Sequence, residues 1–455
     1  MNLIQPHEVS IVILVTFLVF FILIRNYVSK DPLDLWSPMT IIALIFLYYV
    51  VIGPYMALVN EKYFYRLINH RDYFYSAWKL SLISLVFILI GFNVKVNAAV
   101  HAYKEVPSTN TLIKSSGIRL YLMAVIALIL LNGITGFTRQ INFMDPSIAS
   151  GNTGTGTFAN YFYTAINFLT PAACFMLVAT MKKQLNMKVF IFFIAIVLAI
   201  YTTEAFRWRH VVLILSLGII YFSIKKQRPS PVWILGVSFV AITVMGIIGT
   251  TRQYGRGLAL DKLQGQETES MFMEGFSEAT VFLTTGLLVE AVPEHFDYIG
   301  FDPIIQSIAM PVPRQLWPNK PSGKYIRILE RLYGEGSLGR GVAVLNFGEY
   351  YLAFGWIGAM IGAFLIGYFY KRLWVWFKAN RDDPFVVVFY ALAASYLYVI
   401  ISRGYLPQVT MIFFFTVFPA YVVYRIHNKI ALREHWKNVM KQKLEERSSE
   451  NLFVK

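Results

Sequence analysis

Apolar runs of about 20 residues recur along the chain from end to end, and a helix of this length crosses the hydrocarbon core of a bilayer. The chain is 56% hydrophobic and only 15% charged, so charges rarely interrupt these runs and a water-soluble fold is excluded. The sequence therefore predicts an all-α polytopic membrane protein with about eleven transmembrane helices. The predicted spans are residues 9–24, 39–59, 74–93, 118–136, 161–181, 188–203, 209–224, 231–250, 343–370, 385–402 and 408–425.

The charges that flank these spans predict their orientation. Arg25 and Lys30 follow the first span and no cation precedes it, which is the reverse of a cleavable signal peptide. The first span therefore stays as a helix, with the N-terminus outside. Cytoplasmic loops carry an excess of Lys and Arg, and alternating the spans places the main basic clusters and the C-terminus in the cytoplasm. These clusters are Lys95, Lys104 and Lys114; Lys182, Lys183 and Lys188; Lys225, Lys226 and Arg228; Lys371 and Arg372; and the tail at residues 431–455.

One large extracytoplasmic loop, residues 251–342, interrupts what is otherwise a single transmembrane domain over residues 1–455. Loops of this length are usually functional. Residues 276–292 within it are apolar, but counting them as a span would move Lys371 and Arg372 outside. We therefore predict a re-entrant or interfacial helix. Non-helical backbone beside such a helix is tolerated in a membrane only where protein or a water-filled cavity surrounds it, so we expect this helix to pack against a site.

Several function classes are excluded or disfavoured. The single cysteine, Cys174, rules out an intramolecular disulfide and a thiolate metal cage. The net charge of +15 is distributed between spans, so topology explains it and nucleic acid is not expected as a partner. The chain carries no P-loop, no nucleotide fingerprint and no HExxH motif, and we expect neither a metal nor a cofactor. Few ionisable residues lie in mid-span, which argues against an ion-coupled transporter.

Arginine is concentrated on the predicted outer side. Sixteen of 21 lysines fall in cytoplasmic segments, whereas twelve of 20 arginines fall outside, against the usual positive-inside tendency. The planar guanidinium suits two-pronged binding of phosphate or carboxylate. Arg209, Arg252 and Arg403 all lie close to span ends, so we expect them at one membrane depth and converging on one site. The alternative is that such arginines extend to lipid headgroups.

A rigid segment, PVPRQLWPNKP at residues 311–321, lies in the large loop. Its prolines restrict the backbone and remove hydrogen-bond donors. The indole of Trp317 is a suitable stacking platform for a sugar ring, while Arg314 and Lys320 beside it suit phosphate. The alternative is a tryptophan of the interfacial aromatic belt next to an extended linker.

The motifs PRQLWPNKPSG and GEYYLAFGWIG resemble those of the Wzy-type O-antigen and enterobacterial common antigen polymerases. The resemblance extends over roughly residues 200–405 and includes Arg209, Arg252 with Tyr254 and Gly255, and Arg403 with Gly404. It departs from the family at Arg207-Trp208, which precede Arg209 where Gly-Gly-Thr is common, and this leaves the division of roles between Arg207 and Arg209 open.

The resemblance implies a metal-independent enzyme of the bacterial inner membrane, similar in fold to multi-span lipid-dependent glycosyltransferases. Such an enzyme polymerises undecaprenyl-pyrophosphate-linked oligosaccharide repeat units at the periplasmic face. The partners it implies are the lipid-linked oligosaccharides, the lipid bilayer, a flippase and a chain-length regulator. Two alternatives stay open: an O-antigen ligase, and a lipid-linked oligosaccharide flippase or exporter, for which two pseudo-symmetric halves would be expected.

As a mechanistic hypothesis, Arg209, Arg252 and Arg403 bind the donor pyrophosphate, each contact contributing about 1.5 to 3 kcal/mol. Glu349 is the first candidate for the general base, ahead of Glu290, His295 and Glu204. The alternative for Glu349 is a carboxylate that pairs with a loop cation. The predicted substrate-binding residues are Arg207, Arg256, Arg314, Trp317, Lys320, Arg340 and Tyr254.

Overall fold

A computed structural model describes residues 4–97, 107–141, 162–251, 258–259, 274–275, 280–312, 316–321, 323–334 and 342–450. Ten helices are long and apolar enough to cross a membrane, and the bent pair Leu406–Thr416 and Phe418–Lys441 makes an eleventh. These helices coincide with the predicted spans, so the expectation of about eleven transmembrane helices is confirmed. The spanning helices and their parts are α1 (Pro6–Val28), α2 (Pro38–Phe46), η2 (Leu47–Ile52), α3 (Gly53–Val59), α4 (Phe74–Phe92), α5 (Pro107–Ile141), η4 (Ala165–Phe168), α7 (Leu169–Met181), α8 (Met187–Glu204), α9 (Arg207–Lys225), α10 (Pro231–Thr251), α15 (Asn346–Ala379), α16 (Pro384–Ser395), α17 (Leu397–Ser402), α18 (Leu406–Thr416) and α19 (Phe418–Glu450).

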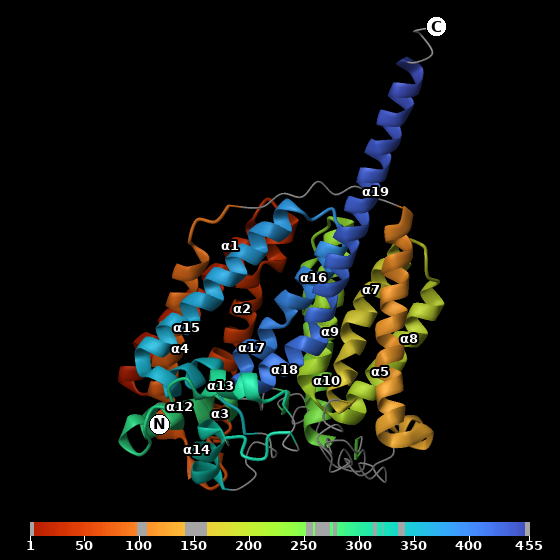
Figure 1. Ribbon diagram of the computed structural model, residues 1–455. Coiled ribbons are helices and arrows are strands. Elements are labelled where there is room, and N and C mark those ends of the chain that lie inside the picture. The colour runs from red at the N-terminus through yellow and green to blue at the C-terminus, as the bar shows by residue number, and fades with distance from the viewer. Residues whose placement is uncertain are drawn as a thin grey trace.

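Shorter elements lie between the spans. Two strands, β1 and β2, form an antiparallel hairpin before α4. The helices α12, α13 and α14 lie at the end of the bundle where the chain begins, whereas α19 extends from the opposite end (Figure 1). The two termini therefore lie at opposite ends, as an odd number of spans requires. The shorter elements are η1 (Pro32–Trp36), β1 (Phe64–Tyr65), β2 (Ile68–Asn69), η3 (Arg71–Tyr73), α12 (Thr280–Glu294), α13 (Asp302–Ala309) and α14 (Lys324–Tyr333).

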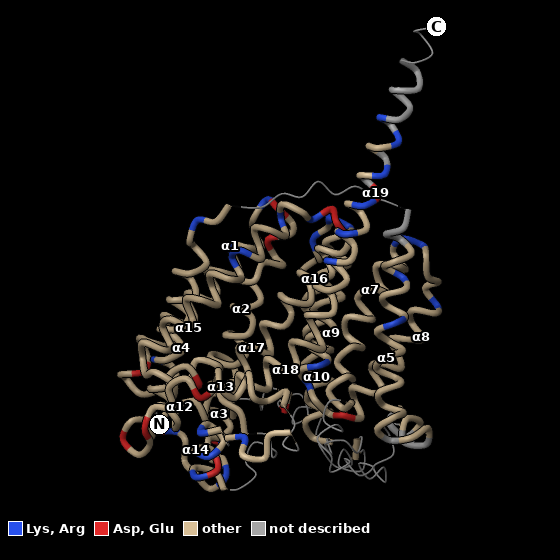
Figure 2. The backbone as a smooth tube through the Cα atoms, viewed as in Figure 1, with Lys and Arg blue, Asp and Glu red and all other residues tan. Residues whose placement is uncertain are grey.

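Local sequence explains where several helices begin. Proline occupies the first turn of α2 and α16, where its missing N–H costs nothing. Polar side chains cap the same ends: the Ser37 hydroxyl accepts from the Thr40 N–H at 3.3 Å, and the Asp383 carboxylate accepts from the Phe385 N–H at 2.8 Å. Charged residues lie mainly toward the two ends of the bundle, and few lie in the long middle sections of the helices (Figure 2).

The helices α4 and α15 form a close pair. A side chain at Gly91 would overlap the carbonyl of Phe364, and one at Gly367 would overlap the carbonyl of Ile88. Glycine at these positions therefore lets the two backbones approach, as in other membrane helix pairs. Gly358 and Gly362 have the four-residue spacing that is typical of close packing between membrane helices, but the atoms nearest to both belong to Tyr350 of the same helix.

This self-contact exists because α15 is broken. Phe354 and Gly355 leave helical geometry, and Gly355 adopts a φ of 63°. The carbonyls of Leu352 and Ala353 accept the main-chain N–H groups of Ile299 and Gly300, both at 3.0 Å. The break therefore leaves these two carbonyls satisfied, as backbone within a membrane requires.

The helix α12 has 15 residues and is not among the candidate spans. It packs against α4 and α15, and most of its residues are buried. Gly286 permits close approach to η3, because a side chain there would overlap the carbonyl of Tyr73. This agrees with the predicted non-spanning helix at 276–292, of which residues 276–279 lie outside the described residues.

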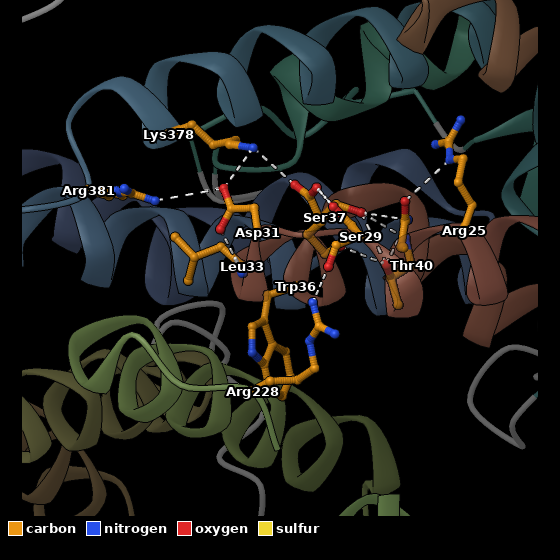
Figure 3. Close-up of polar contacts among 12 residues, drawn as sticks. Arg25, Ser29, Asp31, Leu33, Trp36, Ser37, Thr40, Arg228, Lys378 and Arg381 are labelled. Carbon is orange, nitrogen blue, oxygen red and sulfur yellow. Dashed lines mark hydrogen bonds and ion pairs between the residues drawn. The ribbon is translucent and has the colours of Figure 1, made fainter. Parts of the chain in front are cut away.

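Polar contacts connect several segments at the end of the bundle opposite α12, α13 and α14 (Figure 3). The Lys378 ammonium at the end of α15 pairs with the carboxylates of Asp31, at 2.9 Å, and Asp34, at 3.0 Å, in the connection between α1 and α2. Arg228, which follows α9, donates to the carbonyl of Ser29 in the same connection. Three segments far apart in the sequence are thus joined at this end.

Candidate active site

Glu349 lies in the first turn of the broken helix α15 and is only 1% exposed. Both of its carboxylate oxygens lie 2.9 Å from the main-chain nitrogen of Leu406, the first residue of α18. The first N–H groups of a helix have no partner within the helix, and Glu349 satisfies this one. The carboxylate therefore binds the start of α18, whereas the sequence had suggested a loop cation as the alternative partner.

The turn between α17 and α18 carries Arg403 and leads to Leu406, whose N–H binds this carboxylate. The Gly404 N–H donates to the carbonyl of Val344 at 2.8 Å. A Cβ at Gly404 would lie 2.7 Å from the Val344 Cγ2 and 2.8 Å from the Leu345 carbonyl oxygen, so only glycine fits. Arg403, half-buried and in an extended conformation, immediately precedes this contact. The two residues of the Arg-Gly pair thus differ in role: Arg403 supplies a cation, and Gly404 lets the backbone of the turn approach residues 344 and 345.

The helix α12 supports the other side of the same segment. The Thr284 hydroxyl donates to the carbonyl of Ala343. The Thr285 hydroxyl accepts from the Leu345 N–H at 2.7 Å. Residues 342–345 are therefore held between α12 and the Arg403 turn just before Glu349. The non-spanning helix α12 therefore packs against the segment that leads into Glu349.

Tyr325, on α14, is a neighbour of Glu349 that the sequence analysis did not select. Its ring is 1% exposed and stacks on Tyr405, with ring centroids 5.3 Å apart and planes inclined by 15°. Burial raises the pKa of the Tyr325 phenol well above its usual value, the nearby Glu349 and Tyr405 raise it further, and Arg403 lowers it. Its position on the buried face of a short amphipathic helix, with Ile328 one turn later, was the available signal.

Arg209 forms a second buried group at the start of α9. Arg209 is 3% exposed, and its Nε donates to the Asn167 Oδ1 at 3.1 Å. Its Nη1 lies 3.7 Å from the Glu204 carboxylate, which also accepts from the Tyr163 hydroxyl. Aromatic rings surround the cation, which stabilises its position. The ring centroids of Tyr163, Tyr201, Phe206 and Trp208 lie 5.6, 5.8, 5.1 and 5.4 Å from the guanidinium carbon.

Arg207 points to a different helix. A Cβ added at Gly249, near the end of α10, would overlap the Arg207 guanidinium. The same Cβ would lie 3.3 Å from the Glu274 Cγ. Arg207 therefore packs beside the last turn of α10, the helix that leads to Arg252. Arg207 and Arg209, at the start of α9, thus contact different neighbours. The sequence alone did not distinguish the surroundings of these two arginines.

The Arg209 group and the Arg403 turn are connected through packed elements. Asn167, the partner of Arg209, belongs to η4. This segment packs against α18 through Phe168 and Phe415, whose ring centroids are 5.1 Å apart. The helix α17 also packs against α9. The helices α9, α17 and α18 lie near one another in the bundle (Figure 1).

Lys320 closes the proline-rich loop. Its ammonium donates to the carbonyls of Met310 at 3.1 Å and Val312 at 3.3 Å. Trp317 is 40% exposed and lies between these two ends of the loop in sequence. Part of the work of Lys320 is therefore structural, and the exposed indole keeps a free surface.

Several predicted residues lie outside the described part of the chain, namely Arg252, Tyr254, Arg256, Arg314 and Arg340. Of the lower-ranked base candidates, Glu290 is exposed and accepts from the Ser76 hydroxyl, and His295 is exposed. Among the described residues, no group of three or more His, Cys, Asp or Glu side chains is placed to hold a metal ion.

Comparison with known proteins gives one match. Residues 3–434 match the family model described as O-antigen polysaccharide polymerase Wzy. No curated protein matches the chain. No solved structure matches it either. The family match covers nearly the whole chain, including all the residues of the candidate site.

Proposed function

The chain belongs to the O-antigen polysaccharide polymerase Wzy family and is a membrane polymerase of lipid-linked oligosaccharide repeat units, and from this premise we propose how it performs the reaction. The donor is an undecaprenyl-pyrophosphate-linked glycan, the acceptor is a hydroxyl of another lipid-linked repeat unit, and no metal takes part. The ligase and flippase alternatives are not favoured. One observation carries the mechanism: the buried carboxylate of Glu349 lies at the turn that presents Arg403.

Arg403, Arg209 and Arg252 bind the donor pyrophosphate in this proposal. Charge develops on the pyrophosphate as the bond from the anomeric carbon to its oxygen breaks, and fixed cations stabilise that charge most in a site shielded from water. Arg209 supports this role because its aromatic surroundings and its hydrogen bond to Asn167 hold the guanidinium in place. Its pairing with Glu204 lowers the net positive charge available there.

Glu349 is the general base. The acceptor oxygen attacks the anomeric carbon, its proton passes to the Glu349 carboxylate, and undecaprenyl pyrophosphate leaves. The Leu406 N–H holds the carboxylate in position, and the carboxylate accepts the proton of the acceptor hydroxyl in this proposal. Trp317 stacks on a sugar of the repeat unit, and Arg207, Arg256, Arg314, Lys320, Arg340 and Tyr254 complete the binding surface.

The site faces the periplasm across the bacterial inner membrane in this proposal, since Glu349 and Arg403 lie toward the end predicted to be outside. A flippase then supplies the repeat units at that face, and a chain-length regulator is the expected partner of the polymerase. The carrier chains occupy the lipid-facing grooves between helices.

Polymerisation by purified protein tests the proposal. Undecaprenyl-pyrophosphate repeat units from the native host are incubated with protein in nanodiscs in the presence of EDTA. We expect a ladder of products from the wild type, and none from Arg403→Ala or Glu349→Gln. Arg331→Ala is the matched control, because this arginine is exposed on α14, and it should retain the ladder.

Loss of the wild-type ladder in EDTA, with recovery on adding a divalent cation, would contradict metal independence. A full ladder from Glu349→Gln would remove Glu349 as the base. Translocation of lipid-linked glycan without any polymer would favour the flippase alternative.

A further inference from the structure

The hydroxyl of Tyr325 is buried, and within the described part of the chain it has no hydrogen-bond partner. A buried polar group without a partner is costly, and native structures rarely keep one without a reason. The ring itself is well held by its stack on Tyr405. The ring stack therefore accounts for the position of Tyr325 but not for its hydroxyl.

A second buried polar atom without a hydrogen-bond partner in the described part of the chain lies on α15, close to Glu349 in sequence. The Asn346 Oδ1 also lacks a partner among the described residues, and it lies one helical turn before Glu349 in α15. Residues three apart lie on one face of a helix. Glu349 receives a single backbone donor, and an ionised carboxylate accepts up to about four hydrogen bonds.

These groups are complementary to a hydroxyl. A sugar hydroxyl donates one hydrogen bond and accepts others. Glu349 supplies an acceptor and Tyr325 a donor, and both are withdrawn from solvent at the Arg403 turn. The helix α14 that carries Tyr325 is fastened at its start, because the Lys324 N–H donates to the Asp302 carboxylate at 2.8 Å. The donor is therefore held in place before any ligand binds.

We propose that the Tyr325 hydroxyl binds the attacking hydroxyl of the acceptor sugar, donating to its oxygen while Glu349 accepts its proton. This inference rests on the proposed function and deepens it by assigning an acceptor subsite. Tyr325 keeps its own proton throughout: the acceptor O–H bond breaks, the proton goes to Glu349, and the new glycosidic bond forms as the bond to pyrophosphate breaks. Tyr325 orients one lone pair of the acceptor oxygen and leaves another for attack.

Tyr325→Phe tests the assignment, because it keeps the ring stack on Tyr405 and removes only the hydroxyl. Initial rates are measured in nanodiscs while donor and acceptor repeat units are varied separately. We expect kcat/KM for the acceptor to fall by about tenfold to a hundredfold, in line with the loss of one hydrogen bond to a group that develops charge. The KM for the donor should change by less than about twofold.

Tyr333→Phe is the matched control. It removes another buried hydroxyl from the same helix, one that is bonded to His70 at 2.8 Å. This variant should lose thermal stability but keep the acceptor kcat/KM of the wild type.

Equal losses for donor and acceptor in Tyr325→Phe, with a fall in stability like that of Tyr333→Phe, would make Tyr325 structural and overturn the inference. Wild-type kinetics in Tyr325→Phe alongside an inactive Glu349→Gln would also overturn it, while leaving the proposed function intact. An active Glu349→Gln would instead count against the proposed function.

Discussion

Single residues in this protein are positioned by contacts that are distant in sequence. The partner of Glu349 is a backbone N–H 57 positions later, and the contact of Gly404 is a carbonyl 60 positions earlier. Glu349 and Arg403 could be predicted as site residues because their residue types and their nearness to span ends were informative. Tyr325 could not be predicted in this way, because its stack on Tyr405 depends on packing between segments distant in sequence.

Gly404→Ala should damage the candidate site. A Cβ there would lie within 2.8 Å of Val344 and of the Leu345 carbonyl oxygen, so the turn must move away from residues 342–345. We expect a loss of about 1 to 3 kcal/mol in the free energy of unfolding, as for other overpacked positions, together with loss of polymer. Gly236→Ala is the control, because no described atom lies within 4 Å of its Cβ. Thermal unfolding in detergent and the polymer ladder measure the two effects.

His70 should make stability depend on pH. The Ile68 carbonyl can only accept, so the His70 Nδ1 carries the proton and Nε2 accepts from the Tyr333 hydroxyl. Burial lowers the pKa of His70 below its usual 6.5, although its backbone hydrogen bonds partly oppose this. The unfolded chain therefore binds a proton first as the pH falls, and stability is lost below about pH 6.5.

The comparison with His70→Gln isolates this effect. Unfolding midpoints of both proteins are measured from pH 8 to pH 5. The advantage of the wild type should shrink below pH 6.5. A constant difference between the two proteins over this range would show that His70 does not titrate in the unfolding transition.

At the scale of whole elements, the sequence predicted much and missed one feature. All eleven spans and the non-spanning helix α12 were predicted, because length and hydropathy determine which segments enter a bilayer. The break in α15 was not predicted. Its run of apolar residues is continuous, and the break depends on Ile299 and Gly300, which supply main-chain donors from a loop some 50 residues earlier. The break also explains why the atoms nearest to Gly358 and Gly362 belong to Tyr350 of the same helix.

Gly367→Ala should separate the helix pair α4 and α15. Its side chain would overlap the carbonyl of Ile88, which is backbone and cannot rotate away. We expect a loss of about 1 to 3 kcal/mol, measured as a lower unfolding midpoint. Gly218→Ala serves as the control, because its Cβ would lie 3.5 Å from the Trp36 ring in ordinary contact. Equal midpoints for the two variants would mean that α15 shifts along α4 without cost.

Over the whole molecule, the charge pattern predicts which end of the bundle faces which compartment. Lys378, Arg381 and Lys226 lie at the end opposite the candidate site, paired with Asp31 and Asp382. Burial alone would raise the pKa of Asp31, but its hydrogen bond to Lys378 and the nearby cations lower it overall. This contribution is present above pH 3.8 and is lost below it. The cations at this end therefore join three segments, and the positive-inside tendency predicts that this end faces the cytoplasm.

Cysteine labelling tests the orientation, and the chain is well suited to it. Its single cysteine, Cys174, is fully buried and should not react. Asn60→Cys, after α3, lies toward the candidate-site end, and Lys437→Cys lies on the projecting part of α19. Both positions are exposed. In spheroplasts, a membrane-impermeant maleimide should label Asn60→Cys at once and Lys437→Cys only after permeabilisation, with the wild type as the unlabelled control.

The reverse labelling pattern would place Glu349 and Arg403 toward the cytoplasm. Repeat units would then be polymerised before translocation, and a flippase would have to carry a polymer whose length varies instead of one repeat unit. The odd number of spans makes the two positions report opposite sides. Labelling of both positions in intact spheroplasts would therefore contradict the eleventh span, formed by α18 and α19, and not merely the direction of the bundle.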